Sequence, residues 1–184
     1  MFSFSLGEGV ELRPLEPWQA EEFAAHIDRV REHIAPWLPF ERDITDTESA
    51  RRFLQGFADS QAKDGPRLYG VHRDGTLVGG GFYRLFEPAE GSCELGLWLD
   101  PATQGRGVAA RTLSALIDWA VSARGISRVQ ALVEPENERS LALVKRLGMT
   151  YEGTMRSVFP TGGARMDVQV FSVLADEWKA RPRP

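Results

Sequence analysis

The sequence predicts an α/β (α+β) fold, with a mixed and mostly antiparallel sheet of about seven strands and about four helices. Three observations support this prediction. Apolar residues alternate in several short segments, as in strands, and recur every three to four positions in others, as in helices. The dipeptide Asp74-Gly75 joins two of the alternating segments and suits a tight hairpin turn. No repeat, low-complexity tract or linker interrupts the 184 residues, so one domain with its core at 10–178 is expected.

The N-terminal part is expected to contain one strand and two helices. Val10 to Leu15 alternate as a strand, and apolar residues from Phe23 to Ile34 recur at helical spacing. The segment IAPWLPF at 34–40 contains two prolines and is predicted to be a loop. Thr45-Asp46-Thr47-Glu48 is predicted to be the capping box that starts the second helix, which Gly65-Pro66 ends.

The rest of the chain is expected to add a three-stranded meander, then a helix, a strand, a helix and two strands. Gly79-Gly80-Gly81 is predicted to weaken the middle strand of the meander or to mark a bulge where another backbone comes close. The meander consists of Leu68 to Arg73, Thr76 to Phe86 and Ser92 to Leu99. The later elements are a helix from Val108 to a cap at Gly125, a strand at Arg128 to Val133, a helix at Glu138 to Leu147 closed by Gly148, and strands at Thr150 to Phe159 and Arg165 to Leu174 joined by Thr161-Gly162-Gly163.

Composition restricts the function classes and the compartment. The 22 basic and 26 acidic residues give a formal net charge of −4, which argues against the basic field that nucleic-acid binders use. Cys93 is the single cysteine, so an internal disulfide and a Cys-based metal site are excluded and a reducing compartment is indicated. No segment approaches the roughly 20 apolar residues of a membrane span. A cytoplasmic protein without a metal, nucleic acid or membrane partner is expected.

The segment LGLWLDPATQGRGVAARTL carries the most information about function. A strand runs into Gln104-Gly105-Arg106-Gly107, and a helix follows at once. Glycines let the backbone approach a ligand closely, and the free N–H groups of the first helical turn and the positive end of the helix dipole face negative charge. The pattern therefore predicts a site for phosphate or pyrophosphate.

Residues Gln104 to Ala109 resemble the signature Q/R-x-x-G-x-G/A of the GNAT acetyltransferases. The meander before the signature and the helix, strand, helix and strand pair after it are also similar to the GNAT fold. The resemblance implies that backbone N–H groups of this loop hold the pyrophosphate of acetyl-coenzyme A (acetyl-CoA). The implied cofactor-binding residues are Leu97, Trp98, Leu99, Gln104, Gly105, Arg106, Gly107, Val108, Ala109, Asn137 and Ser140.

Two other interpretations of the glycine loop remain open. Gly105, Gly107 and Ala110 also satisfy the dinucleotide fingerprint G-x-G-x-x-G/A. Against that interpretation, Gln130 stands where an acidic ribose ligand is expected, and an antiparallel meander precedes the motif. The second interpretation is a loop that only turns the chain. A P-loop is excluded because the Gly-Lys-Ser/Thr ending is missing.

A second motif, VEPENERSLALVKRLGM, resembles the pattern N-x-x-S-x-x-x-x-x-x-x-G-F of RimJ/RimL-type proteins in Asn137, Ser140 and Gly148, with Met149 in place of phenylalanine. The resemblance implies that Asn137 contacts the pantetheine arm and that the Ser140 hydroxyl lies near the sulfur. A hydroxyl there can act as general acid toward the leaving thiolate. The alternative is that Asn137 caps a helix and Ser140 is an ordinary first-turn residue.

Weaker resemblance covers both ends of the chain. VREHIAPWLPF is similar to the W-L-P-W segment near the acceptor site, with Phe40 in place of the final tryptophan, and MDVQVFSVLADEW is similar to the terminal D-x-x-x-Y-S-L-L-x-x-E-W. Trp37, Phe40 and Asp167 are the predicted substrate-binding residues. Core packing is the alternative for each aromatic residue, Trp98 and Phe159 included.

An amine must be neutral to attack a thioester, so a group that removes its proton is expected. Glu94 occupies the position where many GNAT enzymes place a carboxylate and is the first candidate, with Asp167 and Glu152 as alternatives that orient the amine. The neighbouring Cys93 is predicted to point to the opposite face, which favours direct transfer over an acyl-cysteine. The three histidines lack the spacing of a metal site and are expected at the surface: His26, His33 and His72.

The resemblance therefore implies an acetyl-CoA-dependent N-acetyltransferase, in which a primary amine attacks the thioester directly. The RimJ/RimL likeness favours a protein N-terminal α-amine, although relatives on the same fold modify small amines, antibiotics or lysine. Acetyl-CoA and this amine are the expected partners, and a homodimer is left open. The alternative from another class is an acyl-CoA-binding or sensing module without turnover.

Overall fold

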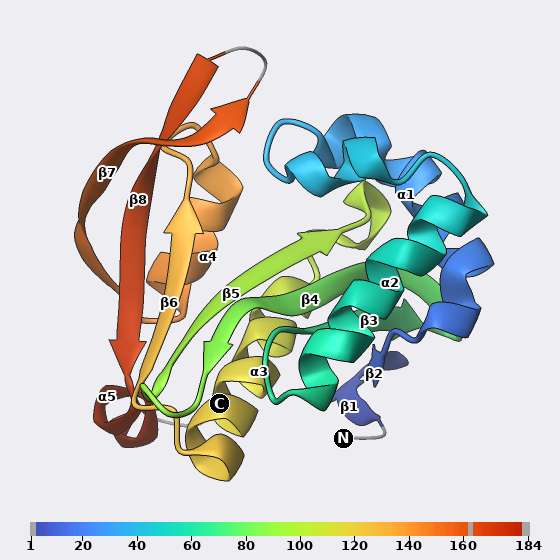
Figure 1. Cartoon of the computed structure of the whole chain (residues 1–184). Coiled ribbons are helices and arrows are strands. Elements are labelled where there is room, and N and C mark those ends of the chain that lie inside the picture. Colours follow the sequence, from blue (N-terminus) through green and yellow to red (C-terminus); the bar gives the residue numbers. More distant parts are fainter. Residues whose placement is uncertain (1–2, 162–163, 182–184) are drawn as a thin grey trace.

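The computed structural model describes residues 3–161 and 164–181, in which eight strands form one sheet with helices on both faces (Figure 1). The strands are β1 (Phe4–Gly7), β2 (Val10–Pro14), β3 (Arg67–Arg73), β4 (Thr76–Glu87), β5 (Ser92–Leu99), β6 (Arg128–Val133), β7 (Thr150–Thr161) and β8 (Ala164–Leu174). The helices are α1 (Ala20–Ile34), α2 (Thr47–Ala62), α3 (Val108–Arg124), α4 (Glu138–Arg146) and α5 (Ala175–Ala180). Short 3-10 helices precede the first three: η1 (Pro17–Gln19), η2 (Pro39–Asp43) and η3 (Pro101–Thr103).

The strand order in the sheet is β1-β2-β3-β4-β5-β6-β8-β7, and each neighbouring pair is antiparallel except β5 with β6. The predicted mixed, mostly antiparallel sheet is confirmed. The sequence does not predict β1 or α5, because β1 has four residues with only Leu6 buried and α5 follows β8 without an intervening turn. Within residues 3–161 and 164–181, no helix has the length and apolar content needed to cross a membrane.

The second helix starts one residue later than predicted. Its N-cap is Asp46, whose carboxylate accepts from the Ser49 N–H at 2.7 Å, while Ser49 Oγ accepts from the Asp46 N–H at 3.0 Å. The prediction of a Thr45–Glu48 box is therefore wrong. Asp46 and Ser49 satisfy both N–H groups at the same spacing.

The predicted glycine turns are present where the structure describes them. Asp74 and Gly75 have φ angles of 50° and 83°, as a tight hairpin turn requires. Gly125 and Gly148 follow α3 and α4 with φ of 68° and 70°, which confirms the two left-handed caps. The predicted turn at Gly162-Gly163 lies outside the described residues.

Two hydrophobic cores lie on opposite faces of the sheet. One is formed with α3 and α4, for example by Leu116 and Val144. The other is formed with α1 and α2, for example by Ile27 and Leu54. Along β5 the side chains alternate between the cores, so that Leu95 belongs to the first and Trp98 to the second.

Strands β5 and β6 pair over only part of their length. Ser92 to Glu94 pair with Arg128 to Gln130. Beyond this point, Leu95 to Leu99 pair with β4 and Ala131 to Val133 pair with β8, but the two strands diverge from each other (Figure 1). Each strand therefore keeps one edge with backbone polar groups that no strand satisfies.

Glycines of β4 and β5 accommodate close neighbours from the opposite strand. A Cβ on Gly80 would lie 2.1 Å from Cη2 of Trp98, and a Cβ on Gly96 would lie 2.1 Å from Cζ of Phe82. At Gly79 a Cβ would lie 2.4 Å from the Trp98 carbonyl oxygen, so the predicted close approach of another backbone is confirmed there. At Gly80 and Gly96 the neighbour is an aromatic ring, and both rings lie over the backbone of the β4–β5 hairpin.

We expect Gly80→Ala to destabilise the fold by about 1–3 kcal/mol, because the added methyl overlaps the buried Trp98 ring. Gly56→Ala is the matched control. Gly56 lies in α2, and a Cβ there would have no atom within 4 Å, so this change should stabilise the helix by up to about 1 kcal/mol. Urea unfolding of the two variants measures the difference. Equal effects would contradict the close contact at Gly80.

Candidate active site

A cleft of about 1010 Å³ opens where β5 and β6 separate. Residues Leu95 to Leu99 line it from β5, and Ala131 to Val133 line it from β6. Leu113 of α3 and Phe53 of α2, which lie on opposite faces of the sheet, also line the cleft. The cleft therefore passes through the sheet and joins its two faces.

The glycine loop lies at the α3 side of the cleft. Gly105 and Gly107 have φ angles of 79° and 71°, and Gly107 is the N-cap of α3. A Cβ on Gly105 would have no atom within 4 Å, so a ligand can approach this backbone. The first turn of the 17-residue α3 leaves N–H groups without helical partners. The loop has the geometry of an anion site.

Most of the predicted cofactor-binding residues meet at this cleft. Those that line it are Leu97, Trp98, Leu99, Gln104, Gly105, Gly107, Ala109, Asn137 and Ser140. Among the described residues, Arg106 and Val108 are not part of the lining. Val108 is buried in the core formed with α3, and the Arg106 carbonyl oxygen accepts from Arg111 Nη1 at 3.1 Å. Trp37 and Phe40, predicted to bind the substrate, also line the cleft.

Gln104 connects two helices across the cleft. Its Nε2 lies 2.8 Å from Nε2 of His33 in α1, and its Oε1 accepts from Nη1 of Arg139 in α4. His33 and Arg139 both line the cleft. The first residue of the predicted signature therefore links the α1 side of the cleft with the α4 side.

Asn137 and Ser140 lie at the start of α4. Asn137 is the N-cap, and its Oδ1 accepts from the Ser140 N–H at 3.1 Å, so the capping interpretation of Asn137 is confirmed. Both residues also line the cleft. Within residues 3–161 and 164–181 the Ser140 hydroxyl has no hydrogen-bond partner, which leaves Oγ available to donate to a group in the cleft.

Glu94, the first candidate for the base, is held in an ion pair. Arg84 donates to the carboxylate through Nε and, at 2.7 Å, through Nη2, and Gln130 Nε2 adds a hydrogen bond at 3.2 Å. Both carboxylate oxygens are therefore occupied by donors from Arg84 and Gln130. The sequence does not reveal this pair, because Arg84 is the extra residue of a β-bulge between Tyr83 and Leu85.

A second carboxylate, Glu134, lines the cleft just after β6. Its side chain is half-buried, and within the described residues no other residue donates a hydrogen bond to it or forms an ion pair with it. Burial raises the pKa of Glu134, and the charge of Glu136 adds to the rise. The motif that contains Asn137 includes Glu134, but only the structure distinguishes it from Glu136 and Glu138, which are exposed and are not among the described residues that line the cleft.

The other predicted carboxylates do not reach the cleft. Glu152 is paired with Arg128 and accepts from Ser172 Oγ, and these contacts lower the pKa of Glu152 to about 2. Asp167 Oδ1 accepts from the Ser157 N–H at 2.8 Å within the β7–β8 hairpin. Among the described residues that line the cleft, neither Glu152 nor Asp167 is present.

The comparisons with known proteins agree with this geometry. The family described as the acetyltransferase (GNAT) domain matches residues 10–150. The chain belongs to the GNAT acetyltransferases. This GNAT enzyme is 26% identical over 184 residues to the protein YdaF of Bacillus subtilis, covering 97% of this chain and 98% of that one. It is 21% identical over 174 residues to the ribosomal-protein-serine acetyltransferase of Escherichia coli, covering 95% and 97%.

Solved structures show the same fold. RimL, described as a ribosomal L7/L12 alpha-N-protein acetyltransferase in complex with coenzyme A, superposes with a TM-score of 0.90 at 21% identity, covering 95% of this chain and 99% of that one. The ribosomal-protein-S5-alanine acetyltransferase from Vibrio fischeri superposes with a TM-score of 0.88 at 25% identity, covering 99% and 100%. The predicted GNAT fold and the RimJ/RimL likeness are confirmed.

The prediction that all three histidines of this GNAT enzyme lie at the surface is wrong. His26 and His72 are 1% and 2% exposed, and His33 lines the cleft. His26 Nε2 accepts from the Trp98 indole N–H at 2.9 Å. Burial, with the nearby Arg29, lowers the pKa of His26 to about 4, so the imidazole is neutral at pH 7 and can accept this bond. The two residues are 72 positions apart, so no local pattern predicts their contact.

Cys93 and Glu94 point to opposite faces, as predicted. Cys93 belongs to the core formed with α3, whereas Glu94 lines the cleft. Burial raises the pKa of the Cys93 thiol to about 12, so little thiolate is present at pH 7. This arrangement disfavours an acyl-cysteine. Within the described residues, no group of three or more His, Cys, Asp and Glu side chains is placed to hold a metal ion.

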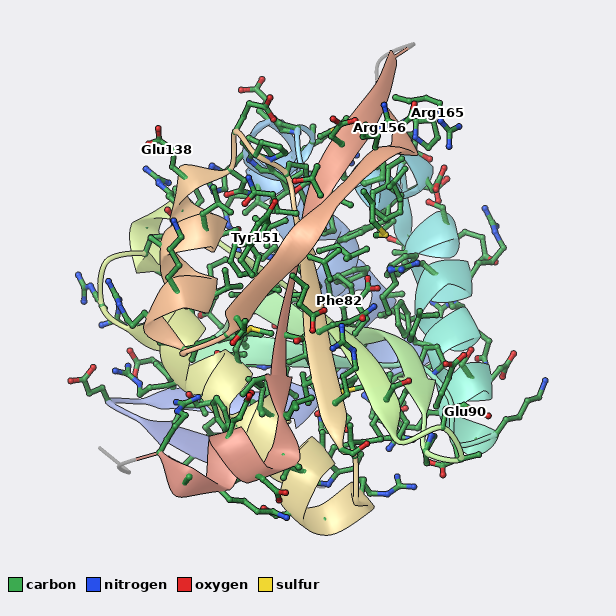
Figure 2. The ribbon with its side chains drawn as sticks, turned by 90° about the vertical axis from the view of Figure 1, so that its left-hand side faces the viewer. Phe82, Glu90, Glu138, Tyr151, Arg156 and Arg165 are labelled. Atoms are coloured by element: carbon green, nitrogen blue, oxygen red, sulfur yellow. The ribbon has the colours of Figure 1, made fainter. Side chains whose placement is uncertain are left out.

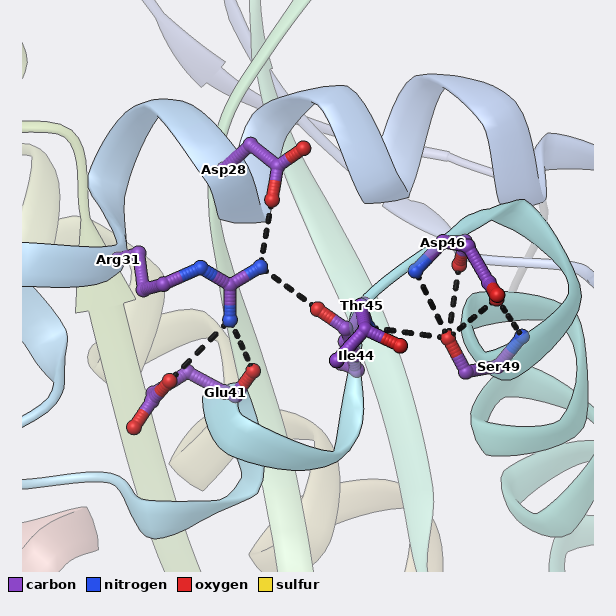
Figure 3. A network of polar contacts seen from close by, with 7 residues as sticks. All are labelled: Asp28, Arg31, Glu41, Ile44, Thr45, Asp46 and Ser49. Atoms are coloured by element: carbon purple, nitrogen blue, oxygen red, sulfur yellow. Dashed lines mark hydrogen bonds and ion pairs between the residues drawn. The ribbon is translucent and has the colours of Figure 1, made fainter.

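The segment between α1 and α2 carries Trp37 and Phe40 along the cleft and is anchored by Arg31 (Figure 3). Arg31 donates to the carbonyl oxygens of Glu41 and Ile44, the second at 2.6 Å, and also to the Glu41 carboxylate at 3.2 Å. The Glu41 carbonyl oxygen also accepts from the Ile44 N–H at 3.2 Å, so Arg31 adds a side-chain donor at the end of η2. The predicted loop is thus fixed in place and contains the short helix η2.

The β7–β8 hairpin reaches the cleft with Phe159. The guanidinium carbon of Arg84 lies 5.6 Å from the centre of this ring. Arg165 donates from Nη2 to the Val158 carbonyl oxygen at 2.9 Å, which supports the irregular stretch before Phe159. Figure 2 shows Arg165 toward the far end of the hairpin, whereas Phe82 lies near the centre of the sheet.

We expect His26 to make the stability of this GNAT enzyme depend on pH. The pKa of His26 is lowered on folding, from 6.5 to about 4, so the unfolded chain binds the proton first. Stability is therefore full above pH 6.5 and is lost as the pH falls toward 4, by about 3 kcal/mol for a shift of this size. His26→Gln keeps an acceptor for Trp98 and does not titrate, so it should lose less. Urea unfolding across this pH interval measures the difference, and parallel curves would contradict a buried neutral His26.

Proposed function

We propose that this GNAT enzyme transfers an acetyl group from acetyl-CoA to a primary amine, with a protein N-terminal α-amine as the acceptor class. The observation that carries the proposal is the cleft through the sheet, with the glycine loop on the α3 side and a group of aromatic residues on the α2 side. Two substrates can thus meet from opposite faces. The names of RimL and of the Escherichia coli relative, which refer to a protein α-amine and to a ribosomal protein, support the acceptor class.

The residues of the α3 side fit acetyl-CoA. The open backbone at Gly105 and the free N–H groups at the start of α3 suit its pyrophosphate. The unpaired edge of β5 from Leu97 to Leu99 offers backbone groups to the amides of the pantetheine arm, in the way that an added strand is bound. Asn137, at the opposite wall, is placed to contact the same arm.

Glu134 and Ser140 are the proposed proton-transfer residues. Glu134 accepts a proton from the amine, whose nitrogen then forms a bond to the acetyl carbon while the carbon–sulfur bond breaks. Ser140 donates a hydrogen bond to the departing sulfur, and the proton that the nitrogen loses on becoming an amide passes to this sulfur, which leaves as the free thiol. Direct transfer of this kind requires no acyl-cysteine, in agreement with the buried Cys93 thiol.

Glu134 replaces Glu94 as the proposed base for two reasons. Glu94 is neutralised by Arg84, whereas Glu134 has no cationic partner within the described residues. Glu134 also shares a face with Glu94, because Gln130 contacts Glu94 and side chains on one strand repeat every second residue. The other titratable residues that line the cleft are His33, Arg84, Arg139 and Arg146, and Glu136 lies nearby.

We expect release of free thiol from acetyl-CoA when the enzyme is mixed with peptides that carry a free N-terminus. Acetyl-CoA should also raise the melting temperature in a concentration-dependent way. Gly107→Val should abolish both effects while the far-UV spectrum stays native, because a β-branched side chain cannot adopt φ of 71° and blocks the loop. Binding of acetyl-CoA without thiol release for any amine would instead support an acyl-CoA-binding module.

We expect Glu134→Gln and Ser140→Ala to lower the rate in different ways. Without Glu134 the amine must lose its proton unaided, so the loss should be largest near pH 6 and shrink toward pH 8, where α-amines are about half neutral. Ser140→Ala should lower kcat by about 100-fold at each pH with little change in acetyl-CoA affinity. Glu94→Gln is the control and should leave the pH dependence unchanged. If the rate loss near pH 6 occurs in Glu94→Gln and not in Glu134→Gln, Glu94 is the base.

A further inference from the structure

Five aromatic side chains gather on the α2 side of the cleft and form what we call the aromatic subsite: Phe40, Phe53, Phe57, Phe82 and Trp98. They come from η2, α2, β4 and β5. The Phe40 ring lies 5.1 Å from that of Phe53 and 5.4 Å from that of Trp98, and the Phe53 and Phe57 rings are 5.3 Å apart. The rings are therefore in mutual contact and make one continuous apolar wall.

This wall is accessible from the cleft. Phe82 and Trp98 are 8% and 4% exposed, but Phe40, Phe53 and Phe57 are only half-buried. Large aromatic side chains that remain half-exposed along a cleft leave apolar surface for a ligand to cover. The buried rings of Trp98 and Phe82 lie over Gly80 and Gly96, so they pack closely against the strands. The space above them is left to the three half-buried rings and to a ligand.

Two charged groups at this end of the cleft are already paired with each other, and Glu134 is the proposed base for the reacting amine itself. Arg84 and Glu94 neutralise each other, and Gln130 bonds to the same carboxylate. A second charge on the acceptor would therefore lose its water without gaining an ionic partner from this pair. An uncharged apolar group gains from burial against the rings.

We propose that the aromatic subsite binds a large apolar or aromatic group next to the reacting amine, so that the preferred acceptors are α-amines of chains that begin with a bulky apolar residue. The proposal rests on the N-acetyltransferase function proposed above. It separates this enzyme from the Vibrio fischeri and Escherichia coli relatives, which are named for the smaller residues alanine and serine. It also disfavours acceptors that carry several cations.

The test compares peptides of one sequence that differ only in the first residue, which is phenylalanine, leucine, alanine, serine or lysine. We expect kcat/KM for phenylalanine and leucine to exceed that for alanine and serine by about 10- to 200-fold, as for other apolar pockets. Lysine should be the poorest acceptor. Equal or better turnover of the serine and alanine peptides would overturn the proposal. It would also be overturned if the enzyme preferred acyl donors longer than acetyl and showed no preference among the peptides.

Variants assign the preference to the subsite. Phe57→Ala and Phe40→Ala should each lower the ratio of phenylalanine to serine turnover, and melting temperatures show whether each variant is folded. Trp18→Ala is the matched control, because Trp18 is 74% exposed and is not among the residues that line the cleft. An unchanged ratio in folded Phe57→Ala and Phe40→Ala would overturn the assignment.

A binding measurement separates this proposal from the proposed function. N-acetylated peptides that begin with phenylalanine or serine are titrated while tryptophan fluorescence is recorded, since Trp37 and Trp98 line the cleft. The subsite is supported if the phenylalanine peptide binds more tightly than the serine peptide and if Phe57→Ala weakens that binding. If no peptide is acetylated in that case, only the proposed enzyme function fails. Equal binding of the two peptides overturns the subsite even if turnover occurs.

Discussion

Three residue pairs join β5 and β6, from Ser92 with Arg128 to Glu94 with Gln130, and this short parallel contact determines where the cleft of the candidate active site opens. Parallel neighbours require a crossover connection, which here is the segment that contains the glycine loop and α3. Because the strands then diverge, the loop at the end of β5 and the helix that follows β6 face the same opening. The glycine loop, the start of α4 and the aromatic subsite therefore border one cleft.

The cleft lies between two hydrophobic cores, and each core supports a different part of the cleft wall. The core formed with α3 supports the glycine loop, whereas the core formed with α1 and α2 supports Trp98 and Phe82. His26 links the second core to the cleft wall by accepting the Trp98 indole N–H, and Arg29 connects His26 with Asp100 just before the loop. These polar contacts, of which only the one between His26 and Trp98 is fully buried, hold the end of β5 at the point where both substrates are proposed to meet.

The sequence was sufficient for features that depend on neighbouring residues. The turn at Asp74-Gly75, the cap at Gly125 and the glycine loop at Gln104 to Ala109 follow from backbone preferences that act within a few positions. It was insufficient for features that depend on distant partners. Two such features arise only when the sheet assembles: the contact of His26 with Trp98 and the ion pair of Arg84 with Glu94. The ion pair also requires a β-bulge that no sequence pattern predicts.

The contacts of Gly80 with Trp98 and of Gly96 with Phe82 also limit how this protein can diverge. A side chain at either glycine position is compatible only with a smaller residue at the partner position. Replacing the glycine alone therefore gives a destabilised protein. We therefore expect the two members of each pair to change together, through compensating mutations. Within the aromatic subsite, Phe82 and Trp98 are thus each coupled to a glycine, so these two positions vary less freely than isolated surface residues.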